Sequence, residues 1–418
     1  MRRALLYSGL TLVGGASLAV LWSVSHSRVF AVPAATSYRN NWNPTAAAAY
    51  LDVREAWWQG WPNAQLDRGT FCVSCHTALP YALARPLLRK QLGQTELTPG
   101  ERDLLNNIEK RVSDWPELKP YYTDSAHAIP SHATEAILNA LILASYSRSR
   151  PSLGPITQRA FDNAWALQET AGENAGGWQW QDFHEAPWES TESAYQGAAM
   201  MAMAEGMRPD LDGSGPAAQE HVDHLRGYLR REYAVQPPIN QLYVLWASSQ
   251  MPGLLSEAQR SELIERIAKL QRPDGGWSLS SLDKQVAFKR GILSFFKRAS
   301  GADVSDGCAT GLTVLALEAA GTDSREPVLS RGLIWLEAHQ RQAGSWWATS
   351  LNGFRNQYIG MGQFMSDAAT GYAVIALEQA RTQQTGVAEG DRNPGSVSRS
   401  AIPRISDRHL STASKQTM

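Results

Sequence analysis

The feature that most constrains the fold of this chain is a pattern that recurs about every 60 residues. Six apolar segments are rich in small residues and poor in charge, and five of them carry a Thr or Ser near their start. These markers, spaced 57, 59, 117 and 60 positions apart, are Thr77, Thr134, Ser193, Thr310 and Thr370. The interval of 117 spans two periods, and the sixth segment begins inside it at Asn240. A period of this length accommodates two helices with their loops.

An amphipathic stretch precedes most of the small-residue segments. The clearest examples are residues 100–113, 155–168, 217–231, 256–270 and 326–340. In residues 256–270, charged side chains alternate with Leu263, Ile267 and Leu270 at helical spacing. Charged faces belong outside and small apolar faces inside. We therefore predict an all-α fold, specifically an α/α toroid of about six helical-hairpin repeats around a central cavity.

A tryptophan motif supports this architecture through a family resemblance. The segment from Arg331 to Trp346, with Gln340 and Gly344, resembles the QW repeat of squalene–hopene cyclases and oxidosqualene cyclases. Residues 168–178 and 271–277 are looser copies, and such repeats would explain why the chain has 15 Trp against 9 Phe. The resemblance covers residues 43–381 and implies the toroid of that family. It also implies that the motif joins neighbouring repeats and performs no chemistry.

The catalytic and zinc-binding motifs of proteins with this toroid are only partly present in the sequence. Squalene–hopene cyclases protonate an alkene with a DxDD motif, which this sequence lacks. Protein prenyltransferase β subunits share the toroid and hold zinc with an Asp-Gly-Cys segment and a later His. Residues 306–308 resemble the first part, but no His follows about 60 residues on. Asp306 and Asp367 are therefore either helix N-caps or acids at the cavity mouth. Cys308 is either a small buried residue or, like Glu192, part of the pocket lining.

The strongest chemical signal is a CxxCH string at residues 72–76. In c-type cytochromes two such thiols bond the haem vinyl groups and the adjacent His is an axial iron ligand. The tight spacing lets one turn present all three groups to one haem edge. We therefore predict a covalent haem c, anchored by Cys72 and Cys75 and ligated by His76. A disulfide or redox pair and a Cys/Cys/His metal site remain as alternatives.

The place of this string in the repeat sharpens the prediction. His76 lies where other repeats start an inner helix, and in a toroid these positions face the cavity mouth. His132, one repeat on, is the tentative sixth ligand of the iron, and the weaker candidates are His127, His184 and the methionines at 200, 201, 203 and 207. An open sixth position would favour oxygen or peroxide chemistry, and a filled one would favour electron transfer.

The two ends of the chain are expected to lie outside the toroid. Residues 1–34 begin with Arg2 and Arg3 and continue with an uncharged, mostly apolar stretch, which predicts a signal peptide or an uncleaved signal-anchor. Residues 383–418 are rich in Ser, Arg, Thr and Gly, which predicts a disordered tail. Because haem c is attached after export, we expect an exported, periplasmic protein that is either free or anchored by its N-terminal segment.

The charge distribution bears on partners. A net charge of −1, from 39 Lys+Arg and 40 Asp+Glu, excludes a strongly basic nucleic-acid binder. Residues 284–298 carry three Phe and five basic residues without an acid. This segment either packs over the rim of the toroid or docks on an anionic membrane surface.

Together these features predict an exported c-type haem protein on a cyclase-like toroid. It would carry out redox or oxidative chemistry on an apolar, isoprenoid-like ligand and exchange electrons with a redox partner. One alternative is a cyclase-like isomerase or lyase without haem, with Asp306 or Asp367 as its acid. The other is a non-enzymatic module for isoprenoid binding or electron transfer, so the sequence leaves open whether the protein is an enzyme.

Overall fold

The structure, a computed structural model, describes residues 41–208, 216–286, 304–348, 350–351, 355–356 and 358–392. These residues form helices and loops with no β-strand among them, which confirms the all-α prediction. The signal segment at 1–34 lies outside the described residues, as does most of the basic segment at 284–298. Within the described ranges, no helix is both long and apolar enough to span a bilayer.

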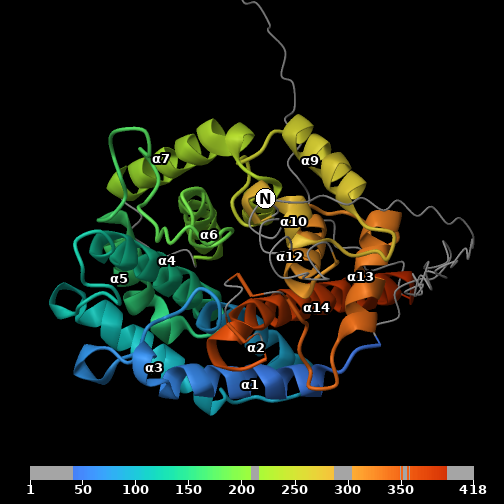
Figure 1. The fold of residues 1–418 in the computed structure, drawn as a ribbon, viewed down its shortest axis with the longest axis horizontal. Helices are drawn as coiled ribbons and strands as arrows, with labels where there is room; N and C mark the ends of the chain where they lie inside the picture. The colour runs from blue at the N-terminus through green and yellow to red at the C-terminus, as the bar shows by residue number, and fades with distance from the viewer. Residues whose placement is uncertain are drawn as a thin grey trace, which may run out of the picture.

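One set of helices lies along the periphery of the molecule (Figure 1). Its members are α1 (Pro44–Gly60), α3 (Pro99–Ser113), α5 (Gly154–Trp165), α7 (Pro216–Glu232), α9 (Glu257–Leu270) and α13 (Pro327–His339). Local signals fix where they begin. Thr98 and Ser256 form capping boxes with Glu101 and Gln259, which satisfy backbone N–H groups at the starts of α3 and α9. The five predicted amphipathic stretches coincide with α3, α5, α7, α9 and α13.

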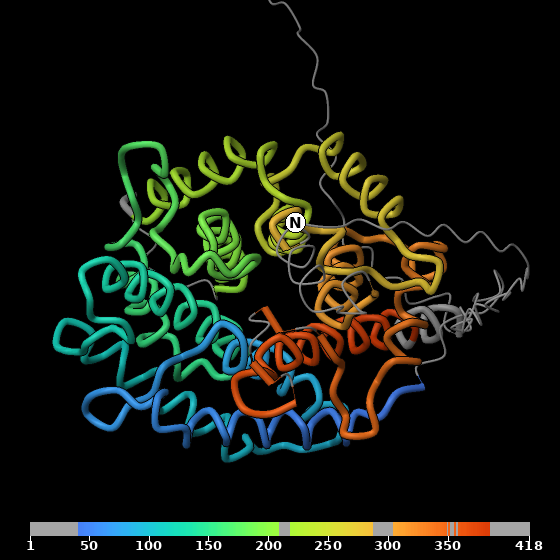
Figure 2. The backbone as a smooth tube through the Cα atoms, viewed as in Figure 1, coloured from blue at the N-terminus to red at the C-terminus, as the bar shows by residue number. Residues whose placement is uncertain are grey.

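The second set lies inside the first, as the backbone tube also shows (Figure 2). Its members are α2 (Ala78–Gln91), α4 (Ala128–Ser147), α6 (Ser193–Met207), α8 (Pro238–Ala247), α12 (Gly307–Ala319) and α14 (Phe364–Arg392). Each helix packs against the next in this order, and α14 packs against α2. Small residues permit these contacts, since a Cβ at Gly371 would lie 2.5 Å from Cβ of Pro80. Helix α14 continues to Arg392, into the segment for which disorder is predicted.

Three Gln–Gly–Trp segments, at residues 168–178, 271–277 and 340–346, make the same hydrogen bonds. Each Trp Nε1 donates to a carbonyl of the preceding peripheral helix, with the pairs Trp178 to Ala164 at 2.7 Å, Trp277 to Ile267 at 2.9 Å and Trp346 to Leu336 at 2.8 Å. Each Gln Nε2 donates to a carbonyl in or beside the next peripheral helix, with the pairs Gln168 to His221 at 3.1 Å, Gln271 to Val328 at 2.8 Å and Gln340 to Asn43 at 2.9 Å. Because Asn43 caps α1, the third segment ties α13 to the first peripheral helix.

The turn before the third tryptophan requires glycine. Gly344 has a φ of 92°, and a Cβ there would overlap the carbonyl oxygen of Ala46 in α1. An L side chain would therefore meet both backbone strain and a backbone clash. The three tryptophans behind these turns are fully buried, so the motif places large apolar side chains between the two layers of helices.

Candidate functional site

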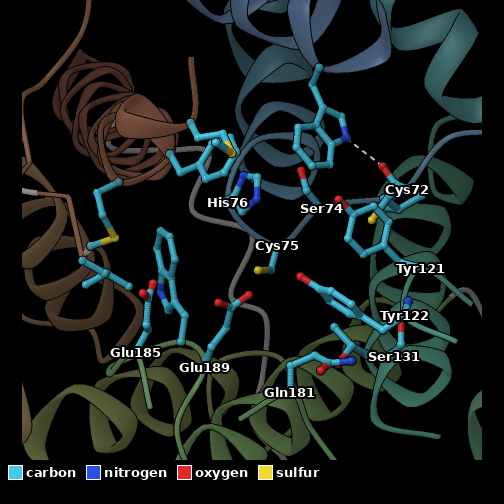
Figure 3. Close-up of a pocket in the computed structure, with 18 of the residues that line it drawn as sticks. Cys72, Ser74, Cys75, His76, Tyr121, Tyr122, Ser131, Gln181, Glu185 and Glu189 are labelled. Carbon is cyan, nitrogen blue, oxygen red and sulfur yellow. Dashed lines mark hydrogen bonds between the residues drawn. The ribbon is translucent and has the colours of Figure 1, made fainter. Parts of the chain in front are cut away.

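A cavity of about 1030 Å³, including the space at its open mouth, lies where the first and last inner helices meet. Its walls come from α1, from residues 72–76 before α2, from residues 121–122, from the loop before α6 and from the start of α14. Figure 3 shows Cys75, His76, Tyr122 and Glu189 around its centre.

The CxxCH segment is fixed on both sides before it enters α2. Trp58 of α1 donates from Nε1 to the carbonyl of Cys72 at 2.7 Å. Asn107 of α3 pairs with both backbone groups of Phe71, at 2.8 and 2.9 Å. The Ser74 hydroxyl accepts from the amides of residues 77 and 78 at 3.3 and 3.0 Å and so caps the helix. The segment is therefore held as a rigid turn on one wall of the cavity.

The two thiols of this turn are free and are kept protonated by their surroundings. Burial raises the pKa of both Cys72 and Cys75. Glu135 raises the pKa of Cys72 further while Arg111 opposes that shift, and Glu189 raises the pKa of Cys75. Thiols that act as nucleophiles or zinc ligands have lowered pKa values and electropositive surroundings. Both thiols are therefore in the protonated form in the free chain, and the haem, redox-pair and metal-site alternatives all stay predictions.

His76 has one ring nitrogen engaged and the other free. Nδ1 lies 2.9 Å from the hydroxyl of Thr77, and that hydroxyl donates to Oδ2 of Asp367 at 2.8 Å. Nε2 makes no hydrogen bond with any residue that the structure describes. The ring stacks on Phe364, with centroids 3.5 Å apart, and meets Trp58 edge-on at 4.9 Å. Burial lowers the pKa of His76 well below its ordinary value, and Arg54 and Arg355 lower it further, so the imidazole is neutral.

Asp367, predicted as a cap or a cavity acid, is instead a buried hydrogen-bond acceptor in the first turn of α14. Arg54 of α1 donates from Nε at 2.7 Å and from Nη2 at 2.9 Å, and Tyr50 donates its hydroxyl at 2.8 Å. Burial raises the pKa of the Asp367 carboxyl, and the donors around it oppose that shift. A carboxyl that receives both nitrogens of a guanidinium is in the ionised form. Asp367 does not line the cavity and has no proton to give to an alkene.

The other predicted pocket residues lie away from this cavity. Asp306 caps α12, because its side chain accepts from the amides of residues 308 and 309 at 3.0 Å each, and it also accepts from Leu279 at 2.9 Å. Cys308 is buried in the first turn of α12. Glu192 precedes α6 and accepts from Gln285 at 2.6 Å. Asp306 therefore acts as the predicted cap, and none of the three lines the cavity.

The predicted sixth ligands also lie outside the cavity lining. His132 is in the second turn of α4 and packs against Trp115, with ring centroids 4.8 Å apart. His127 pairs with Asp124, and His184 is largely exposed. The methionines at 200, 201 and 203 are buried in the core between helices. Other methionines do line the cavity, namely Met361 and Met365.

The wall opposite the CxxCH turn was not predicted from the sequence. It is formed by the loop before α6, in which the backbones of Glu185 and Glu189 pair at 2.8 and 3.0 Å. The Glu189 carboxyl points into the cavity towards Cys75 (Figure 3) and accepts no hydrogen bond from a described residue. Gln181 presents a buried side-chain oxygen that also has no hydrogen-bond partner in the described part of the chain. The sequence signal is a pair of glutamates four residues apart between a Gln–Gly–Trp turn and an inner helix.

Glu189 is a carboxyl that stays protonated close to neutral pH. Burial raises its pKa to about 7, and the neighbouring Glu185 adds to the shift while Arg355 opposes it. It is therefore able to donate or accept a proton in a cavity whose other polar groups, apart from Glu185, Glu135 and Arg355, are uncharged.

We expect Glu189→Gln to change the pH dependence of stability. Between the ordinary glutamate pKa and about 7, the folded chain binds this proton and the unfolded chain does not, so wild-type stability falls as the pH rises through this window. The variant should match the wild type at pH 4.5 and exceed it by about 3 kcal/mol at pH 8. Urea unfolding at both pH values tests this, with the exposed Glu96→Gln as control. An equal difference at both pH values would contradict it.

The donor set of this cavity fits a haem c. Both thiols and the free imidazole nitrogen belong to one turn, and the other described lining residues supply carboxyl, amide and phenol groups and the thioethers of Met361 and Met365, but no second His. Aromatic side chains of Trp58, Trp61 and Phe364 surround the turn, as an apolar macrocycle requires. The sequence itself matches no protein-family model and no curated protein.

Proposed function

We propose that the chain is an α/α toroid of six helical-hairpin repeats, similar to that of terpenoid cyclases and prenyltransferases. Two observations support the proposal. The inner helices contact one another in a continuous order that returns from α14 to α2. The Gln–Gly–Trp segments repeat one hydrogen-bond pattern between peripheral helices, and the last of them joins α13 to the cap of α1.

We further propose that this toroid is an exported, periplasmic haem c protein. Cys72 and Cys75 would anchor the macrocycle, and Nε2 of His76 would ligate the iron. The observation that carries the proposal is that both thiols and a neutral imidazole nitrogen, unpaired among the described residues, face one cavity from a single rigid turn. When bound, the haem supplies a redox centre that none of the side chains of the cavity provides.

The residues that line the cavity bear on the class of reaction that the protein would carry out. Among the described residues, no histidine besides His76 lines the cavity, whereas Met361 and Met365 do. If neither thioether reached the iron, the sixth position would be open to a ligand, which favours oxygen or peroxide chemistry over electron transfer alone. Glu189 would hold or release a proton in the cavity near neutral pH. The aromatic side chains would accept an apolar, isoprenoid-like molecule through the open mouth. Electrons would come from a redox partner protein, and residues 284–298 remain a candidate for contact with a membrane.

The cyclase-like alternative has less support. Its two candidate acids, Asp306 and Asp367, each accept several buried hydrogen bonds, and neither lines the cavity. An acid strong enough to protonate an alkene needs a proton and access to the substrate. We therefore favour the haem protein as the function of this cavity.

The test is an absorption spectrum of the chain exported from a host with c-type haem maturation. We expect a Soret band that shifts on reduction and stays with the polypeptide after denaturation. The same chain kept in the cytoplasm of that host, without maturation, should be colourless and serves as the control. A folded, helical and colourless product from the matured culture would overturn the haem proposal.

A further inference from the structure

We infer that Asp367 and Thr77 are positioning residues that fix the imidazole of His76 in one tautomer, with the proton on Nδ1 and the lone pair of Nε2 directed to the cavity. The inference rests on the proposed function for what Nε2 binds. The tautomer itself is a property of the polypeptide and is testable without any cofactor.

The first step of the argument is a count of hydrogens at Thr77. Its hydroxyl has a single hydrogen and lies 2.8 Å from Oδ2 of Asp367 and 2.9 Å from Nδ1 of His76. A carboxylate only accepts, so the hydroxyl hydrogen goes to Asp367. The hydroxyl then accepts from His76, which requires the hydrogen of the neutral ring to be on Nδ1. The histidine Nε2 is left with its lone pair.

The second step is that Asp367 has no freedom to act as a donor. Arg54 binds both of its oxygens, and the side chains of this ion pair are 6% and 1% exposed. Tyr50 donates to Oδ1, and burial together with Asp367 raises the pKa of Tyr50, so the phenol keeps its hydrogen. All the hydrogen bonds around the carboxylate therefore run towards it, and the orientation of the Thr77 hydroxyl is fixed.

The third step is that ring packing alone does not select the tautomer. Phe364 and Trp58 hold the plane of the His76 ring, but both contacts are equally compatible with a hydrogen on either nitrogen. The tautomer is selected by a hydrogen bond to α14. Thr77 immediately precedes α2, whereas Asp367, which accepts from its hydroxyl, lies in α14, 290 residues further along the chain. Helix α14 packs on both α1 and α2, so the ligating form of His76 depends on the junction of the first and last inner helices.

The chemical consequence is a more basic Nε2. A histidine whose second nitrogen donates towards a carboxylate is a better metal ligand, and loss of such a partner usually costs 10- to 100-fold in metal affinity or activity. Here the carboxylate acts through a hydroxyl and is itself paired with Arg54. His76 is thereby oriented and enriched in electron density without a net charge buried beside it.

The test uses the full chain made without haem maturation and labelled with ¹⁵N histidine. We expect the His76 signals, assigned by their absence in His76→Gln, to show a single neutral form with hydrogen on Nδ1. Thr77→Val removes the hydroxyl at similar volume and should give a mixture in which the Nε2–H form is at least a tenth of the population. Thr77→Ser should restore the single form, and His132 in the same sample should not change.

A wild-type ring with its hydrogen on Nε2 would overturn the inference, as would an unchanged tautomer in Thr77→Val. If Thr77→Val does not fold, the tautomer of His76 in the wild type and in Thr77→Ser still tests the inference. In the matured protein, Thr77→Val should raise the reduction potential and Thr77→Ser should return it to the wild-type value. A colourless matured protein with the Nδ1–H form would overturn the proposed function and leave the inference standing.

Discussion

Changing Cys72 and Cys75 together to Ala is expected to remove all covalently bound pigment from the matured, exported protein. Thioether bonds from these two sulfurs would be the only covalent links between chain and macrocycle. Each single variant keeps one thioether and should retain pigment in part. The measurement is the Soret absorbance per polypeptide after denaturation and removal of free haem, for the wild type, both single variants and the double variant.

The chain provides its own control for this experiment. Cys308, the third cysteine, is buried in α12 and does not line the cavity, so Cys308→Ala should keep the full covalent absorbance. Pigment that survives denaturation in the double variant would show that the attachment uses other residues. Loss of pigment in Cys308→Ala, with the fold intact by circular dichroism, would contradict the assignment of the two anchoring thiols.

The peripheral helices were predictable because their periodicity is strong. Charged residues alternate with apolar ones along α3, α7, α9 and α13, and caps such as Ser256 mark their starts. Helix α1 lacks such a pattern, since it opens with a run of alanines and buries Arg54 and Glu55 beside its apolar residues. No amphipathic helix was predicted there. From sequence alone, a charged residue that is buried against a distant partner cannot be told from one that faces solvent.

The site was predictable only where its residues are neighbours in sequence. The CxxCH turn is local, and the structure places all three of its functional side chains at the cavity. His132 follows from the repeat spacing, but α4 begins at Ala128, and this earlier start packs the His132 ring on Trp115, away from the cavity. The role of Asp367 comes from partners about 300 residues away, which no local pattern encodes. Glu189 was missed because it faces Cys75 across the cavity from a distant part of the chain, which no local pattern encodes either.

The ion pair behind His76 leads to the largest expected effect on stability. Arg54→Met should lower the free energy of unfolding at pH 7 by about 3–5 kcal/mol, because it leaves the buried Asp367 carboxylate without its counter-charge. Without Arg54, the burial that raises the pKa of Asp367 is less opposed. The folded variant then holds a proton that the unfolded chain loses, so the deficit should shrink as the pH is lowered towards 4.

Urea unfolding followed by circular dichroism, at pH 7 and pH 4, measures this effect. Arg325→Met removes an arginine from an exposed pair with Asp323 and should leave the unfolding free energy unchanged at both pH values.

The double variant Arg54→Met/Asp367→Leu removes both charges and should recover much of the stability, since an apolar pair of similar size avoids the cost of a buried charge. It should not recover the single tautomer of His76, because Thr77 then has no carboxylate to orient its hydroxyl. If the double variant is as unstable as Arg54→Met at pH 7, the loss comes from packing of the arginine side chain and not from the uncompensated carboxylate.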